Sequence, residues 1–122
     1  MSATAMVLFA HGARDPRWAG PFQRLQELTQ ARLPDVEVKL AFLELMTPSL
    51  PELIQQLLTQ AHTRITLVPV FLGQGGHLLR DLPAMVQQLR DAHPALELTV
   101  VEAVGEQASV LAAISDYCIA SV

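Results

Sequence analysis

The chain of 122 residues contains little cysteine, few aromatic residues and no excess of basic residues. Cys118 is the single cysteine, which excludes an intrachain disulfide and a zinc or iron–sulfur site built from cysteines. Such cysteine usage suits a reducing compartment, so we expect a cytoplasmic protein. Eight Lys and Arg residues against twelve Asp and Glu residues give a net charge of −4, which argues against nucleic acid as a partner.

Long apolar runs are also missing. Hydrophobic residues make up 51% of the chain, but no stretch approaches the roughly 18 consecutive apolar residues of a membrane span. The first residues, Met1 to Thr4, lack the positive charge and apolar run of a signal peptide. The apolar content is instead sufficient for the core of one domain, so we expect residues 1–122 to form a single domain without membrane contact.

Short apolar runs alternate with segments of helical periodicity along the chain. Strands are predicted at Thr4–Ala10, from Val36 to about Glu44, at Ile65–Phe71 and at Leu96–Val101. Helices are predicted from Asp15-Pro16 to Leu33-Pro34, from Ser49 to Ala61, from about Asp81 and Pro83 to His93-Pro94, and from Glu106 to Ile119. This alternation indicates an α/β fold, a four-stranded parallel sheet with helices on both faces and right-handed crossovers.

Local signals support several of these elements. Asp15 before Pro16 is typical of a helix start, and Ser49 with Glu52 has the spacing of a capping box. The last helix carries an apolar stripe formed by Val110, Leu111, Ile114, Tyr117 and Cys118. We expect the fold to use the whole chain, this helix included.

Candidate functional residues follow the strands, because ligands of open parallel sheets bind beyond the carboxyl ends of the strands. His11 follows the first strand, Glu44 ends the second, and His77 lies beyond the third. Imidazole and carboxylate groups suit divalent cobalt, iron, nickel or zinc, and histidine can also take up a proton near neutral pH. We therefore predict that His11, His77 and Glu44 bind metal and act in catalysis. Alternatively, each histidine is only a hydrogen-bonding loop residue, and Glu44 caps the next helix or lies in solvent.

A glycine-rich turn, Gly73-Gln74-Gly75-Gly76, precedes His77. Its glycine spacing matches neither the P-loop nor the dinucleotide-binding fingerprint. We interpret Gly75 and Gly76 as substrate-binding residues that let a bulky ligand approach His77. Two arginines, Arg14 and Arg80, flank the histidines and could pair with substrate carboxylates, or they could be solvated. Apolar surface for a flat ring could come from three larger side chains, those of Trp18, Met46 and Phe71. For Phe71, packing in the core is the alternative.

Three segments together resemble the class II chelatases, most closely the short sirohydrochlorin cobaltochelatases. They are VLFAHGARDPRW, AFLELMTPSL and VPVFLGQGGHLLRDLP, and they occur in the order and at the separations of that family. The resemblance spans nearly the whole chain and implies a flavodoxin-like lobe that inserts a divalent metal into sirohydrochlorin, a tetrapyrrole of cobalamin and siroheme synthesis. It matches His11 and His77 to the family's metal-binding, proton-accepting histidines and Glu44 to its acidic partner.

The resemblance also implies a homodimer, because longer relatives are similar to two such lobes in tandem. Candidates for the contact are Met46, Leu79 and Met85, with core packing as the alternative for Met85. The metal is a substrate, with cobalt expected and iron or nickel as alternatives, and no organic cofactor is implied.

Two other interpretations use the same residues. A strand followed by His-Gly is also found in histidine phosphatases, but these need an arginine directly before the histidine, and Ala10 stands there. The cluster of His11, Glu44 and His77 could also belong to a non-enzymatic metal carrier or sensor.

Overall fold

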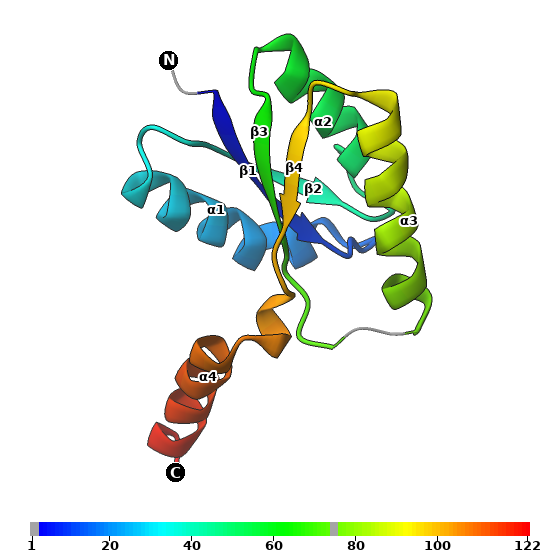
Figure 1. Cartoon of the computed structure of the whole chain (residues 1–122). Helices are drawn as coiled ribbons and strands as arrows, with labels where there is room; N and C mark the ends of the chain where they lie inside the picture. The colour runs from blue at the N-terminus through cyan, green and yellow to red at the C-terminus, as the bar shows by residue number, and fades with distance from the viewer. Residues whose placement is uncertain (1–2, 74–75) are drawn as a thin grey trace.

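Four parallel strands form the centre of the protein in a computed structural model, which describes residues 3–73 and 76–122 apart from the side chains of residues 76–80. The strands are β1 (Thr4–Ala10), β2 (Glu37–Phe42), β3 (Arg64–Pro69) and β4 (Glu97–Val100). They lie in the order β2-β1-β3-β4, and Figure 1 shows helices on both sides of this sheet. In register, Leu8 of β1 lies between Leu40 of β2 and Val68 of β3. The predicted parallel α/β sheet is confirmed.

The helices follow the strands in the predicted order. They are α1 (Gly20–Arg32), α2 (Leu50–Thr59), α3 (Gly76–Ala92) and α4 (Ala108–Ala120), with 3-10 turns η1 (Pro16–Ala19) and η2 (Val104–Glu106). Two predicted caps are confirmed. The carboxylate of Asp15 accepts a hydrogen bond from the backbone N–H of Arg17, and Ser49 and Glu52 form a reciprocal capping box. Hydrogen bonds from the Arg17 side chain lower the pKa of Asp15.

Several predicted boundaries are wrong. The third helix begins at Gly76, well before Asp81, and Pro83 lies inside it. Proline has no N–H to donate and is favoured in a first helical turn, which is why the sequence predicts a start there. In the folded chain Pro83 is exposed, so its ring points away from the core. The first helix is divided, because a 3-10 turn precedes the α-helix that begins at Gly20.

The first strand has the predicted bounds, and the other three strands are shorter than predicted. β2 ends at Phe42, so Glu44 lies in the loop beyond it. β3 ends at Pro69, since proline cannot donate to the next strand of a ladder.

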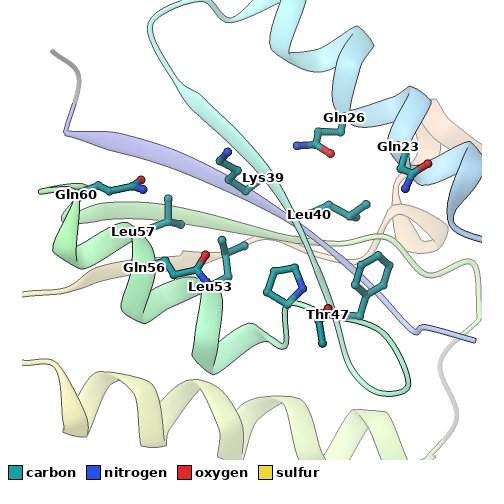
Figure 2. A pocket seen from close by; sticks show the side chains of 11 residues that line it. Gln23, Gln26, Lys39, Leu40, Thr47, Leu53, Gln56, Leu57 and Gln60 are labelled. Atoms are coloured by element: carbon teal, nitrogen blue, oxygen red, sulfur yellow. The ribbon is translucent and has the colours of Figure 1, made fainter.

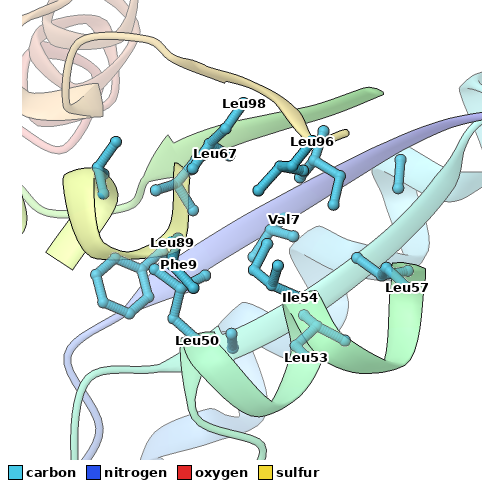
Figure 3. Packing of buried hydrophobic residues seen from close by; sticks show 14 of the residues in the cluster. Val7, Phe9, Leu50, Leu53, Ile54, Leu57, Leu67, Leu89, Leu96 and Leu98 are labelled. Atoms are coloured by element: carbon cyan, nitrogen blue, oxygen red, sulfur yellow. The ribbon is translucent and has the colours of Figure 1, made fainter. Parts of the chain in front are cut away.

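Two apolar clusters hold the layers together. Figure 3 shows the larger one, in which Val7 and Phe9 of β1 pack against Leu50 and Ile54 of α2, with Leu89 of α3 nearby. The second cluster lies on the opposite face, where side chains of β1 and β2 pack against η1 and α1; its members include Leu8, Ala10, Val38, Leu40, Phe42, Trp18 and Phe22. These clusters fix the carboxyl ends of β1, β2 and β3 beside one another.

Three of the singled-out apolar residues contribute to these clusters. Phe71 is 7% exposed and its ring meets that of Phe9 edge-on, with centroids 5.8 Å apart, so core packing is confirmed for it. Met85 packs against the larger cluster and Met46 against the second, both half-buried. The side chain of Leu79 lies outside the described residues.

The last helix differs most from the prediction. Figure 1 shows α4 leaving the body of the protein beyond the carboxyl end of β4. All 13 of its residues are described and none is buried, so the expectation that the fold uses the whole chain is not met by this helix. No helix in the described part of the chain is long and apolar enough to cross a membrane.

Charged pairs line the two outer strands. On β2, Nζ of Lys39 lies 3.1 Å from Oε1 of Glu37. On the other side, Nε of Arg64 in β3 lies 3.4 Å from Oε2 of Glu97 in β4. Both outer strands therefore carry charge on their exposed face.

Candidate active site

The chain segments that follow β1 and β2 continue side by side beyond the sheet. The N–H of Leu43 donates to the carbonyl of Ala10 at 2.9 Å, and the N–H of Glu44 donates to the carbonyl of His11 at 3.1 Å. These bonds extend the parallel ladder just past the strand ends. They bring His11 and Glu44 to the same point on the carboxyl edge of the sheet, as the sequence predicts.

The side chains of His11 and Glu44 contact one another directly. Nε2 of His11 lies 3.0 Å from Oε1 of Glu44, a hydrogen-bonding distance. The side chains are 52% and 55% exposed, so a ligand can reach both. In the tautomer with its proton on Nε2, the ring donates to the carboxylate and keeps a lone pair on Nδ1.

Gly12 makes this contact possible, a role that was not predicted from the sequence. Its φ of +96° lies in the region that favours glycine, and a Cβ there would come within 1.8 Å of the carbonyl oxygen of Glu44. That same oxygen accepts the N–H of Met46 at 2.8 Å, so the loop after Glu44 is held against Gly12. A glycine directly after the histidine at a strand end was the available signal.

Phe71 limits the orientation of the histidine ring. The two ring centroids lie 6.4 Å apart with an interplanar angle of 83°, an edge-on arrangement. Since Phe71 is itself fixed in the core, it offers a rigid wall behind His11. A core aromatic that also supports the site could not be recognised from the sequence, because both roles need the same residue type.

The other predicted site residues are placed less completely. His77 is the second residue of α3, the helix that follows β3 in the chain, but its side chain, that of Arg80 and the whole of Gly75 lie outside the described residues. Gly76 is the first residue of α3. Among the described residues, no group of three or more His, Cys, Asp or Glu side chains could hold a metal ion. The structure thus brings together two of the three predicted ligands.

A hollow is lined by residues of the segments that follow His11 and Glu44 in the chain. Its volume is about 310 Å³, and Arg14, Leu45 and Met46 are among the residues that line it. Arg14 is exposed and has no ion-pair partner among the described residues, whereas Arg17 is paired with Asp15 at 2.7 Å. Arg14 is therefore available to bind an acidic group of a ligand in this hollow.

A second hollow of about 350 Å³ lies beside β2, between α1 and α2. Figure 2 shows its lining of glutamines, among them Gln23, Gln26, Gln56 and Gln60. Of the described residues that line it, Lys39 is the one that carries a charge, and none is a histidine, aspartate or glutamate. This hollow lacks the chemistry found at the carboxyl edge of the sheet.

Comparison with known proteins identifies similar sequences. The profile of the CbiX family matches residues 5–119. The sirohydrochlorin cobaltochelatase of Methanocaldococcus jannaschii is 33% identical over 89 residues, which cover 73% of this chain and 62% of the relative. The sirohydrochlorin ferrochelatase of Priestia megaterium is 28% identical over 102 residues, 83% of this chain and 38% of the relative. The chain thus spans less than two thirds of the length of these two relatives.

Similar folds are found among solved structures. A cobalamin biosynthesis CbiX protein from Marinobacter aquaeolei is 31% identical, with a TM-score of 0.85 and coverage of 97% of this chain and 96% of the other. The sirohydrochlorin chelatase of Bacillus subtilis subspecies spizizenii, solved in complex with cobalt, is 21% identical, with a TM-score of 0.74. The match covers 85% of this chain and 44% of that one, and at this identity it shows a shared fold.

Proposed function

Because the chain belongs to the CbiX family, we propose that it is a chelatase that inserts a divalent metal ion into sirohydrochlorin. Cobalt is the metal we expect, with iron and nickel as the alternatives. The pairing of His11 with Glu44 at an exposed strand end carries this proposal. Relatives named sirohydrochlorin cobaltochelatase and ferrochelatase support the substrate and leave the choice of metal open.

The His11–Glu44 pair has the chemistry that metal insertion needs. A carboxylate that accepts the Nε2 proton makes the lone pair on Nδ1 more basic. Nδ1 can then hold a divalent ion and, after releasing it, accept a proton. One entering metal ion replaces two pyrrole N–H protons of the macrocycle, so two bases are required. We assign the first proton to His11 and the second to His77, with Glu44 as the group that orients His11 and contributes to metal binding.

The remaining assignments concern the macrocycle and its metal. We propose that Arg14 and Arg80 pair with its acidic side groups and that Gly75 and Gly76 let it approach His77. The reaction needs no nucleotide or organic cofactor, since the metal–nitrogen bonds formed supply the driving force. The single cysteine favours a reducing cytoplasm as the location.

We further propose that the active form is a homodimer. Binding pockets for drug-sized ligands have volumes of about 300–1,000 Å³ and bury about 70–90% of the ligand surface. The hollow lined by Arg14 and Met46 is about 310 Å³, at the low end of that range, and a tetrapyrrole disc is larger than such ligands. A second copy related by a two-fold axis would cover the other side of the disc.

The proposed function is tested by mixing the protein with sirohydrochlorin and Co²⁺ and following the absorption spectrum. A chelatase converts the spectrum to that of the metallated macrocycle much faster than the same mixture without protein. If the protein binds Co²⁺ but leaves the rate of metallation unchanged, it is a metal carrier or sensor and the proposal is wrong.

Glu44→Gln tests the role of the carboxylate. Glutamine preserves the shape but removes the charge that makes His11 basic, so we expect turnover to fall about 10–100-fold. Unfolding free energy should change by less than about 0.5 kcal/mol, because the pair is half-exposed. Glu37→Gln is the matched control, since it breaks an ion pair with Lys39 that lies away from the site. A lower melting temperature with unchanged turnover would make Glu44 a structural residue.

A further inference from the structure

Two exposed leucines lie in the segments that flank His11 at the carboxyl edge of the sheet. Leu45 directly follows Glu44, whose carboxylate contacts the His11 ring. Leu72 directly follows Phe71, whose ring meets that of His11 edge-on. Leu45 is 59% exposed and Leu72 is 64% exposed. Because β1 lies between β2 and β3, the segments that carry these leucines lie on opposite sides of His11.

The backbone of Leu45 is strained. Its φ is +65°, in the left-handed region that glycine and asparagine adopt more readily than leucine. The N–H of Met46 donates to the carbonyl of Glu44 at 2.8 Å and closes a tight three-residue turn with Leu45 at its centre. Turns of this kind with a positive φ are rare. Left-handed backbone in residues other than glycine is concentrated at functional sites, where the surrounding structure holds it.

Packing in the core does not explain a leucine at this position. More than half of Leu45 is exposed, and the residue belongs to neither of the two apolar clusters. Isolated exposed leucines are common on protein surfaces, but left-handed backbone is rare for them. Asparagine or glycine would form the same turn with less strain. The leucine side chain therefore serves something other than the stability of the fold.

The turn after β4 fixes the backbone of Leu72. The N–H of Gly105 donates to the carbonyl of Phe71 at 2.9 Å. A Cβ at Gly105 would lie 1.9 Å from the carbonyl oxygen of Leu72, so the close approach of these two segments requires a glycine. Leu72 is thus held in place by its backbone while it stays exposed to a ligand.

The hollow that Leu45 lines combines apolar and cationic groups. Leu45 and Met46 line it together with Arg14, which has no ion-pair partner among the residues that the structure describes. A ligand that suits this lining has an apolar body and an acidic periphery. A tetrapyrrole has both, because its flat ring is apolar and its acidic side groups lie around the edge of the ring.

We propose that Leu45 and Leu72 contact the apolar ring of the macrocycle on the two sides of His11 and hold it there for metal insertion. Apolar contacts are non-directional, so they bind the ring without taking part in metal binding. The strained turn and the fixed backbone of Leu72 order both contacts before the ring arrives, which favours binding. This role rests on the proposed function, since it concerns the substrate of the same site.

Leu45→Asn separates the role of the side chain from that of the backbone. Asparagine tolerates left-handed backbone, so we expect the melting temperature to stay the same or to rise by about 2–4 °C. The variant loses an apolar contact, so the Kd for metal-free sirohydrochlorin, measured by the fluorescence of the macrocycle, should rise about 10–100-fold. The affinity for Co²⁺ alone should stay natural, because the metal ligands are unchanged.

Leu72→Asn should raise the Kd for sirohydrochlorin by a similar factor. Its melting temperature should stay natural, since Leu72 is exposed and does not have a positive φ. Ala61→Asn is the matched control for the backbone, because Ala61 has a φ of +67° at the opposite edge of the sheet. Leu28→Asn is the matched control for the side chain, because Leu28 of α1 is 67% exposed. Both controls should bind sirohydrochlorin with natural affinity.

The outcomes distinguish a substrate contact from the alternatives. A natural Kd for sirohydrochlorin in Leu45→Asn or in Leu72→Asn would overturn the proposed contacts. A weaker affinity in Leu45→Asn together with a lower melting temperature would also overturn them, because Leu45 would then be a structural residue. Sedimentation of the same preparations excludes a third role, since a changed oligomeric state would mean that the leucines contact another copy of the chain.

Metal insertion by the natural chain is assayed separately. Natural insertion with unaltered macrocycle binding in both leucine variants would refute the contacts and leave the proposed activity standing. A natural chain that does not bind sirohydrochlorin would refute both the activity and the contacts.

Discussion

His11→Ala is expected to abolish most metal insertion while the protein stays folded. The side chain is half-exposed and contacts mainly Glu44 and the edge of Phe71, so its loss removes little packing. The variant loses a metal ligand and a base together, and removal of a general base alone costs about 10²–10⁴ in rate. His77→Ala should have the same effect, since it removes the proposed second base.

The measurement compares initial rates of Co²⁺ insertion with thermal unfolding curves for the same preparations. His93→Ala is the control, because His93 follows α3 at the opposite, amino-terminal edge of the sheet. It should retain the natural rate. Near-natural turnover in both His11→Ala and His77→Ala would refute the site assignment, whatever the other variants show.

Gly12→Ala is expected to lower both stability and activity strongly. The added Cβ would meet the carbonyl oxygen of Glu44 at 1.8 Å, and an L-residue is strained at a φ of +96°. Overpacking typically costs about 1–3 kcal/mol and left-handed strain about another 1–2 kcal/mol. The loop carrying Glu44 must then move away from His11, so metal insertion should fall by more than the loss of folded protein explains.

Gly20→Ala serves as the matched control for this substitution. Gly20 is already helical at a φ of −51°, and a Cβ there would meet only Nη1 of Arg24, at an ordinary 3.6 Å. Its melting temperature and turnover should stay close to natural values. For Gly12→Ala we expect a fall in melting temperature of roughly 10 °C or more. If Gly12→Ala has the same melting temperature and turnover as Gly20→Ala, the close approach of Gly12 to the carbonyl of Glu44 is not needed for stability or activity.

Much of the fold could be predicted because its signals are local. The apolar runs of β1 and β3, the cap at Asp15 and the capping box at Ser49 each act within a few residues. The meeting of His11 with Glu44 followed from a general rule, since the carboxyl ends of neighbouring parallel strands share an edge.

The remaining features depend on contacts between distant residues. Nothing near Gly12 in the sequence shows that the carbonyl of Glu44 will occupy the space of its missing side chain. Proline is favoured in the first turn of a helix, so Pro83 predicts that the helix starts close to it. The helix instead begins at Gly76, and such a choice between two starting points depends on tertiary contacts. The spacing of the apolar residues in α4 correctly predicts a helix, but periodicity cannot specify whether that helix packs on its own chain.

The charges on the outer strands have a consequence for aggregation. An edge strand exposes unpaired N–H and C=O groups, and these can template the addition of strands from other molecules into fibrils. Here β2 presents Glu37 and Lys39, and β4 has only four residues and presents Glu97. Short length and charge both oppose the addition of a further strand. Copies of the folded chain are thereby discouraged from extending the sheet at either of its edges.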